Sequence, residues 1–276
     1  MSVLKIENLT IKKQEETIVD NVCIDIKAGE WLALVGESGS GKSVTATVIG
    51  GLLPKALKIE SGNILLENQN ILNLNERAFR KIRGKQISYI FQDYQGAFSP
   101  FIKIGKQFDE MLASHTTWKK RERVELTLHM LDSVNLSAQQ VYNNYPFQLS
   151  GGQVQRAAIA IATILKPKLL IADEPTTALD SLTSLKVLEL IYNLKEQTGC
   201  AVLFITHDLR HVKKYANNLS IMLRGKLVEY GDKKEIVEKP KHEYTKQLLS
   251  AIPPLRNSPT RLLTINTEKE KEVTIV

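Results

Sequence analysis

One glycine-rich segment near the start of the chain constrains its fold more than any other feature. Its residues are, in order, Gly36, Glu37, Ser38, Gly39, Ser40, Gly41, Lys42 and Ser43. The segment matches the pattern G-x-x-x-x-G-K-S/T, and it lies between an apolar run at 31–35 that predicts a buried strand and a helix expected from 41 to about 52. A strand, a glycine-rich turn and a helix in this order predict a loop that holds phosphate through backbone N–H groups. Lys42 is then expected to reach the β- and γ-phosphates of a nucleotide, and Ser43 to ligate Mg²⁺.

The remaining pattern predicts an α/β fold, with a P-loop NTPase core and a mostly parallel sheet. Alternating apolar and polar residues predict strands at 4–11 and 18–26 and a hairpin at 59–72, with turns at Ser61-Gly62-Asn63 and Glu67-Asn68. Apolar runs predict further strands, and helical periodicity predicts helices between them. These strands are expected at 87–91, 169–172 and 201–205, and the helices at 151–165 and 181–197.

The helical texture of residues 94–165 predicts a helical subdomain inserted into the core. We therefore expect one α/β domain at 1–252 with this insert, followed by a short polar tail at 253–276.

Composition excludes several classes of protein. Of the 276 residues, 43% are apolar and 24% are charged, which argues against disordered and fibrous chains. Lys and Arg number 37 against 30 Asp and Glu, a formal net charge of +7, which permits an anionic partner but is also ordinary for a solvated basic surface. The basic clusters at 77–85 and 119–123 are open to the same two interpretations, solvated helix faces or contact with anionic lipid.

The cysteines and the apolar stretches predict a cytoplasmic location. Cys23 and Cys200 form no Cys-x-x-Cys pair and are predicted to be buried free thiols of a reducing compartment. The N-terminal residues contain charges where a signal peptide would need an apolar region, and the longest apolar stretch, 157–165, is too short for a bilayer. Any membrane role is expected to come through a partner.

Two acids, Asp173 and Glu174, directly follow the predicted strand at 169–172. Carboxylates at the carboxyl end of a parallel strand face the ligand crevice. Asp173 therefore suits Mg²⁺, and Glu174 suits a general base that polarises an attacking water.

A second candidate anion site begins a later helix. Ser150, Gly151, Gly152 and Gln153 lie at its start, with Ser150 as a good N-cap and the glycines exposing backbone amides. The alternative is an ordinary capped helix start. Two phosphate sites in one chain make sense if each serves a nucleotide held by a different subunit.

These segments, together with Gln92, residues 178–180 and His207, occur in the order found in ATP-binding cassette (ABC) ATPases. The chain from about 2 to 252 resembles the nucleotide-binding subunit of an ABC transporter. The resemblance implies that residues 1–252 form an ABC ATPase domain, in which the mostly parallel sheet is accompanied by an antiparallel β subdomain. The resemblance implies that two subunits sandwich two ATP molecules head to tail, with the phosphate loop of one facing the signature, Leu149–Gln153, of the other. It also implies that ATP and Mg²⁺ are the cofactors.

The resemblance implies a role for each site residue. Gln92 resembles the lid-loop glutamine that touches Mg²⁺ or water, Asp180 the acid that couples the two sites, and His207 the histidine that contacts the γ-phosphate. His207 and His211 are also four residues apart, as helical metal ligands can be. The implied catalytic residues are Glu174, His207 and Gln92. The implied nucleotide-binding residues are Gly36, Glu37, Ser38, Gly39, Ser40, Gly41, Lys42, Ser43, Ser150, Gly151, Gly152, Gln153 and Asp180. The implied Mg²⁺ ligands are Ser43, Gln92 and Asp173.

A narrower resemblance rests on four segments. They are similar to segments in the ATPases of oligopeptide, dipeptide and nickel importers and comprise residues 89–93, 97–100, 104–105 and 242–253. One departure is Glu243, which stands where the H-P-Y-T tail of that group has proline. This narrower resemblance implies ATP-driven uptake of nickel, another metal chelate or oligopeptides. The implied partners are a second ABC ATPase subunit, expected to be a paralogue, two integral membrane permease subunits and an extracytoplasmic solute-binding protein. The chain would then lie at the cytoplasmic face of the cell membrane.

Two departures and one rival class complete the prediction. The loop at 12–17 has no aromatic residue to stack on adenine, and no cysteine follows Cys200, so no iron–sulfur cluster is expected. The rival is a non-transport ABC ATPase acting on nucleic acid or ribosomes. It is disfavoured because residues 44–148 leave no room for a long coiled coil and the chain holds one cassette. Nucleic acid is therefore not expected as a partner.

Overall fold

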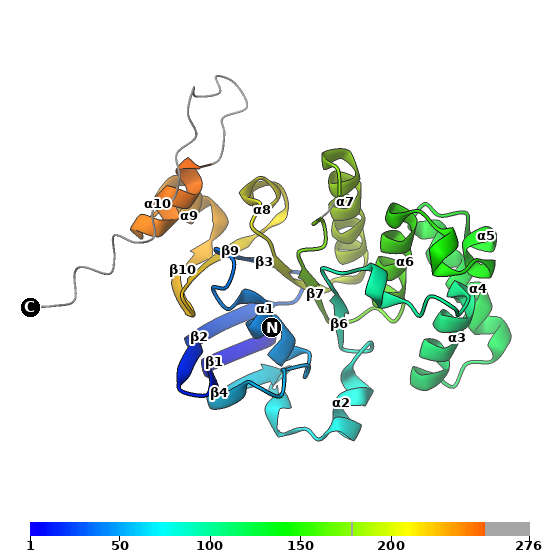
Figure 1. Ribbon diagram of the computed structural model, residues 1–276, viewed down its shortest axis with the longest axis horizontal. Coiled ribbons are helices and arrows are strands. Elements are labelled where there is room, and N and C mark those ends of the chain that lie inside the picture. The colour runs from blue at the N-terminus through cyan, green and yellow to red at the C-terminus, as the bar shows by residue number, and fades with distance from the viewer. Residues whose placement is uncertain (178, 252–276) are drawn as a thin grey trace, which may run out of the picture.

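Two β-sheets share one hydrophobic layer in the part of the chain that this computed structural model describes, residues 1–177 and 179–251 (Figure 1). One sheet has the order β2-β1-β4-β5 and is antiparallel. Its strands are β1 (Ser2–Lys13), β2 (Glu16–Lys27), β4 (Lys58–Leu66) and β5 (Gln69–Asn70). The other has the order β10-β9-β3-β8-β7-β6 and is parallel except for the β9–β10 pair. Its strands are β3 (Trp31–Val35), β6 (Ile87–Ile90), β7 (Leu169–Asp173), β8 (Ala201–Ile205), β9 (Asn218–Leu223) and β10 (Lys226–Asp232).

The central parallel strands are buried on both faces. Every residue of β3, β7 and β8 is buried, which explains why these segments are continuous apolar runs. The predicted bounds of β3 and β8 are confirmed. Because the carboxyl ends of parallel strands lie at one edge of the sheet, the residues after β3, β6, β7 and β8 are brought to the same edge. This edge carries the candidate site.

Helices cover the parallel sheet, and those of the later chain pack on the face opposite the antiparallel sheet. The helices outside the insert are α1 (Lys42–Ile49), α2 (Glu76–Ile82), α7 (Ser181–Thr198), α8 (Leu209–Tyr215), α9 (Lys233–Glu238) and α10 (Glu243–Ser250). Trp31, Phe204 and Tyr215 form an aromatic group under α7 and α8. Tyr244 of α10 is buried in the same layer.

Four helices form a separate group with a core of its own (Figure 1). They are α3 (Ile104–His115), α4 (Lys120–Ser133), α5 (Ala138–Asn143) and α6 (Gly151–Thr163). Phe108, Leu131 and Ala157 are fully buried in that core. The predicted fold class, an α/β core with an antiparallel sheet and a helical insert, is confirmed. The domain limits 1–252 and 94–165 stay predictions, and the tail at 253–276 lies outside the described residues.

The predicted hairpin at 59–72 is partly wrong. Residues 61–63 lie inside β4, where the pairing with β1 shifts between Glu7↔Asn63 and Thr10↔Ser61. Gly62 has φ 104, and a Cβ there would lie 2.6 Å from the Cα of Leu9, so glycine permits a bulge against β1 instead of a turn. The turn is at Glu67-Asn68, where φ is positive at both residues as a two-residue hairpin turn requires.

The prediction that both cysteines are buried is correct for Cys200 and wrong for Cys23. Burial raises the pKa of the Cys200 thiol to about 12. Cys23 is exposed because β2 alternates, with Val22 and Ile24 turned into the core and Cys23 turned away from it. Neighbouring residues of the same strand thus differ in burial although all three are apolar.

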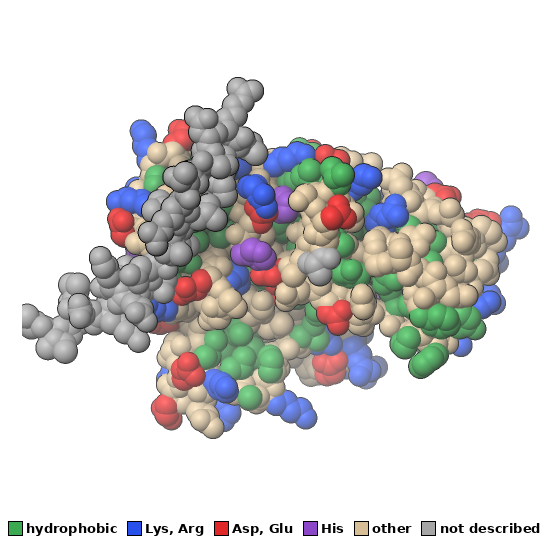
Figure 2. All heavy atoms as spheres, turned by 45° about the horizontal axis from the view of Figure 1, so that its top comes forward, with side chains coloured by type: hydrophobic (Ala, Val, Ile, Leu, Met, Phe, Trp, Pro, Cys, Tyr) green, Lys and Arg blue, Asp and Glu red, His purple; other side chains and the backbone are tan. Residues whose placement is uncertain are grey.

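The basic clusters are partly neutralised by nearby acids. Arg80 and Arg83 pair with Glu76, and Arg123 pairs with Asp109. On the face shown in Figure 2, basic and acidic side chains are interspersed. No helix among the described residues is long and apolar enough to cross a membrane.

Candidate active site

The phosphate-binding loop connects β3 to α1, and two of its glycines allow close backbone contacts. A Cβ at Gly36 would lie 2.1 Å from the carbonyl oxygen of Met222 in β9. Gly41, the N-cap residue of α1, has φ 103, and a Cβ there would lie 2.9 Å from the carbonyl oxygen of Ile18. Glycine at these positions lets the loop lie directly against two strands.

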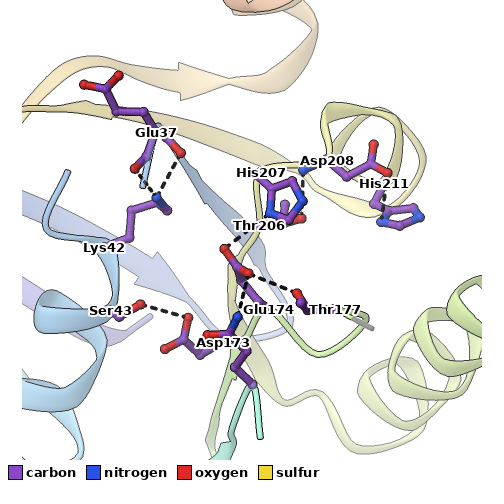
Figure 3. A network of polar contacts seen from close by, with 12 residues as sticks. Glu37, Lys42, Ser43, Asp173, Glu174, Thr177, Thr206, His207, Asp208 and His211 are labelled. Atoms are coloured by element: carbon purple, nitrogen blue, oxygen red, sulfur yellow. Dashed lines mark hydrogen bonds and ion pairs between the residues drawn. The ribbon is translucent and has the colours of Figure 1, made fainter. Parts of the chain in front are cut away.

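Lys42 is buried, and its amine is folded back into the loop (Figure 3). Its Nζ donates to the carbonyl oxygens of Gly36 at 2.9 Å and Glu37 at 2.6 Å. Burial lowers the pKa of the Lys42 amine, an effect opposed by the carboxylates of Glu174, Asp173 and Glu37. The amine is therefore a buried hydrogen-bond donor that oxygen atoms of the loop and of nearby carboxylates surround. A donor of this kind suits a loop that binds anions.

Asp173 is the last residue of β7, and its two carboxylate oxygens have different partners. Oδ1 accepts from the hydroxyl of Ser43 at 3.3 Å, and Oδ2 accepts from the hydroxyl of Tyr89 at 3.0 Å. Burial raises the pKa of Asp173, while the hydrogen bonds from Tyr89 and Ser43 lower it. Burial also raises the pKa of Tyr89, so Tyr89 is a neutral donor.

Sequence reasoning missed Tyr89. It lies on β6, which pairs with β7 in parallel, so its ring reaches the acid of the neighbouring strand. The signal was a tyrosine hydroxyl in the predicted strand, three residues before Gln92. The sequence does not indicate that β6 and β7 are neighbours in the sheet.

Glu174 is the residue on which the candidate catalytic side chains converge (Figure 3). Its Oε2 accepts from Gln92 Nε2 at 3.2 Å and from Thr177 Oγ1 at 3.0 Å, and its Oε1 lies 3.3 Å from His207 Nδ1. Its backbone has φ 46, a left-handed value that costs of order 1–3 kcal/mol for a residue with a side chain. The backbone N–H of Glu174 donates to the Ile205 carbonyl at 2.9 Å, which holds this conformation.

The structure thus brings Gln92, Glu174 and His207 together beside Lys42, Ser43 and Asp173. Thr177 is a second residue that sequence reasoning missed. His207 precedes α8 and does not share a helix with His211. Within residues 1–177 and 179–251, no group of three or more His, Cys, Asp or Glu side chains is placed to hold a metal ion. The alternative of a histidine metal site therefore has no support here.

The second candidate anion site lies apart from the first. Ser150 caps α6: its hydroxyl accepts from the Gln153 N–H at 3.4 Å, and the Gln153 side chain accepts from the Ser150 N–H at 2.8 Å. Ser150, Gly151, Gly152 and Asp180 line a groove of about 890 Å³ between α6 and α7. No residue of the phosphate loop lines this groove, so one chain does not bring its two candidate anion sites together.

Asp180 is the N-cap of α7, and its carboxylate is used locally. It accepts from the backbone N–H groups of Leu182 and Thr183, both at 3.0 Å, and from the Thr183 hydroxyl at 2.5 Å. These hydrogen bonds, the one from the Thr183 hydroxyl first, lower the pKa of Asp180. Ala178, which precedes it in the predicted motif, lies outside the described residues.

The residues near the loop fit the groups that the sequence implies. The Ser43 hydroxyl and the Asp173 carboxylate form an adjacent pair of oxygen ligands, which suits Mg²⁺ because that ion takes few protein ligands and completes its shell with water and phosphate oxygens. Lys42 and the backbone amides at the start of α1 suit a phosphate chain. The fit agrees with the predicted nucleotide and metal.

Two family descriptions match the chain. Residues 19–177 match the family described as ABC transporter, and residues 228–275 match the oligopeptide/dipeptide transporter C-terminal region. The dipeptide transport ATP-binding protein DppD of Lactococcus lactis is 40% identical over 95% of this chain and 77% of its own. The metal-staphylopine import system ATP-binding protein CntD of Staphylococcus aureus is 40% identical over 91% of this chain and 93% of its own.

Solved structures agree with these matches. The bacterial ABC transporter cassette MJ0796, described as a dimer, matches with a TM-score of 0.73 at 30% sequence identity. The match covers 83% of this chain and 98% of the MJ0796 chain. A second structure of that cassette is described as a post-hydrolysis state bound to ADP and Pi. The relatives are transport ATP-binding proteins, which agrees with an importer ATPase and does not support the non-transport alternative. The chain belongs to the ABC transporter family, as an ATP-hydrolysing subunit of the importer group that carries the oligopeptide/dipeptide transporter C-terminal region.

Proposed function

We propose that Glu174 is the general base for ATP hydrolysis in this importer subunit, and that Gln92 and His207 position the attacking water beside it. The observation that carries this proposal is the convergence of Gln92, Thr177 and His207 on the Glu174 carboxylate. A general base must lie within hydrogen-bond reach of the proton that it takes, and these neighbours fix where the carboxylate points. Glu174 has a left-handed backbone directly after β7, and its side chain points toward this group (Figure 3).

Residues 36–43 are proposed to bind the phosphate chain of ATP. Lys42 can exchange its contacts with the Gly36 and Glu37 carbonyls for phosphate oxygens, because an ammonium group has three donors. Ser43 and Asp173 would hold Mg²⁺, with Gln92 as the third contact. When bound, the ion neutralises charge on the phosphates. Tyr89 keeps Asp173 oriented by donating to its second oxygen.

The groove between α6 and α7, lined by Ser150, Gly151, Gly152 and Asp180, is proposed to receive the nucleotide held by a second ATPase subunit. The groove lies apart from the chain's own phosphate loop, and this separation supports a site completed between two subunits. The similar cassette MJ0796 is described as dimeric, which agrees with this arrangement. We propose a paralogous partner, as the resemblance to peptide and nickel importers implies.

The transported solute is proposed to be a short peptide or a metal chelate, nickel included. The support is that similar proteins are named for dipeptide transport and for metal-staphylopine import. The proposed partners are two integral membrane permease subunits and an extracytoplasmic solute-binding protein, with this chain at the cytoplasmic face of the membrane. Uptake of labelled peptide and of metal in a strain lacking the gene tests the proposal: loss of either identifies the solute, and loss of neither contradicts it.

The test of the general base is the Glu174→Gln variant, assembled with its membrane partners. ATP turnover is expected to fall about 10²- to 10⁴-fold, because removal of a general base costs that much, while ATP still binds. Glu125→Gln is the control, since Glu125 is an exposed glutamate of α4 that pairs with Arg121 and lies outside both the phosphate loop and the groove between α6 and α7. Turnover of Glu174→Gln equal to that of the control would contradict the assignment.

A further inference from the structure

One contact joins the C-terminal region of the chain to the phosphate-binding loop. The hydroxyl oxygen of Tyr244, on α10, accepts a hydrogen bond from the backbone N–H of Glu37 at 2.9 Å. The two residues are 207 positions apart in sequence. Tyr244 is 3% exposed, and its ring packs in the hydrophobic layer beneath the parallel sheet. The hydroxyl is thus held in place by a buried ring.

The start of α10 is fixed by its own contacts, so the position of Tyr244 is well determined. The ring Nδ1 of His242, the N-cap residue, accepts from the Tyr244 backbone N–H at 3.1 Å. The Glu229 carboxylate of β10 accepts from the backbone N–H groups of His242, at 2.7 Å, and of Lys241. Glu243 occupies the first helical position, where an acid and a proline are both favourable. The departure from H-P-Y-T therefore leaves the helix start intact.

The backbone N–H and the backbone carbonyl of Glu37 are both hydrogen-bonded. The N–H donates to the Tyr244 hydroxyl oxygen, and the carbonyl oxygen accepts from Lys42 Nζ at 2.6 Å. When Lys42 turns to a phosphate oxygen, as proposed above, the carbonyl loses that donor. The contact with Tyr244 does not depend on Lys42, so it can hold the first turn of the loop while the amine changes partner.

We infer that Tyr244 is a positioning residue for the phosphate-binding loop, through which the C-terminal region sets the affinity of the loop for nucleotide. The inference rests on the proposed nucleotide site. It gives a role to the tyrosine of the His242–Thr245 segment, which lies within the matched C-terminal region. Tyr244 acts through the Glu37 backbone and does not itself meet the phosphates.

The test compares Tyr244→Phe with Tyr230→Phe in the full-length chain. Both substitutions remove one hydroxyl from the C-terminal region, and the Tyr230 hydroxyl donates to the Asp25 carbonyl at 2.6 Å, outside the loop. Tyr244→Phe is expected to weaken MgATP binding about three- to tenfold, as the loss of one neutral hydrogen bond does. In the assembled transporter the KM for ATP should rise by a similar factor while kcat stays within about twofold. Tyr230→Phe should change neither.

A second readout does not depend on nucleotide. Hydrogen exchange of the Glu37 amide should be about tenfold faster in Tyr244→Phe and unchanged in Tyr230→Phe, because only the first removes the acceptor of that N–H. Equal exchange rates in Tyr244→Phe and the wild type would overturn the inference, as would equal losses of affinity in both variants. A wild-type chain that fails to bind MgATP would contradict the proposed function, while the exchange rate would still decide whether Tyr244 holds the loop.

Discussion

The two helix starts that mark the candidate anion sites are built in opposite ways. No side chain of the described residues caps α1, which begins at Lys42 after the left-handed Gly41. Ser150 and Gln153 cap α6 reciprocally, each accepting from the backbone N–H of the other. The first helix leaves its N-terminal donors for a ligand, whereas the second satisfies two of them within the chain.

The charges around the two helix starts differ as well. Lys42 and Asp173 are buried beside α1, and burial shifts the pKa of each toward the neutral form. Asp180, beside α6, is exposed, and hydrogen bonds lower its pKa. Burial thus disfavours the charged forms of Lys42 and Asp173, whereas hydrogen bonds favour the charged form of Asp180.

Removal of the Lys42 amine is expected to have the largest effect on binding by the single chain. Lys42→Ala should weaken ATP binding about 100-fold or more, because hydrogen bonds from a charged donor to phosphate are worth about 1.5–3 kcal/mol each. Titration of the isolated chain with MgATP measures this. The control is Lys195→Ala, since Lys195 is also buried but pairs with Glu196 on α7. Affinity of Lys42→Ala within about threefold of the wild type would break the distinction between the two helix starts.

Removal of the Ser150 cap should separate binding from turnover. Ser150→Ala is expected to leave the single chain's affinity for ATP unchanged, since the groove it lines is apart from the phosphate loop. Turnover of the assembled transporter should fall about tenfold, consistent with loss of about 1.4 kcal/mol of contact to the partner's nucleotide.

Asn75→Ala is the matched control, because Asn75 caps α2 by accepting from the Ala78 N–H at 2.9 Å. Both variants lose an N-cap, which costs about 1 kcal/mol of stability. If Ser150→Ala and Asn75→Ala slow turnover equally, loss of helix stability explains the effect and the groove has no separate role.

The features of the site that could be predicted are those encoded by neighbouring residues. The phosphate loop, the acids after β7 and the Ser150 cap each depend on a short segment, so their residue types and spacing suffice. The strands β3 and β8 were predicted to the residue because strands buried on both faces are apolar throughout.

The features that were missed depend on which elements become neighbours. Tyr89 meets Asp173 only because β6 lies beside β7. Tyr244 meets Glu37 only because α10 returns to the loop at the end of β3. The segment around Gly62 is a bulge because β1 continues past it. Strand order and register are properties of the assembled sheet, and local patterns do not encode them.

The smallest expected effect concerns the stability of the empty protein. Burial raises the pKa of Asp173, so the native state binds a proton at this carboxyl more tightly than the unfolded state does. Stability is therefore lost as pH rises from the ordinary aspartate range through the raised pKa, and the ionised carboxylate destabilises the native state at neutral pH.

Asp173→Asn should raise the Tm of the nucleotide-free chain at pH 7 by about 2–4 °C, and the gain should shrink as the pH falls and the wild-type carboxyl is protonated. Differential scanning calorimetry across pH measures this. Ser150→Ala should lower the Tm, so Tm changes of opposite sign in the two variants would sharpen the comparison of the two helix starts. A lower Tm in Asp173→Asn at pH 7 would instead show that the hydrogen bonds of Asp173 with Ser43 and Tyr89 outweigh the cost of burying its charge.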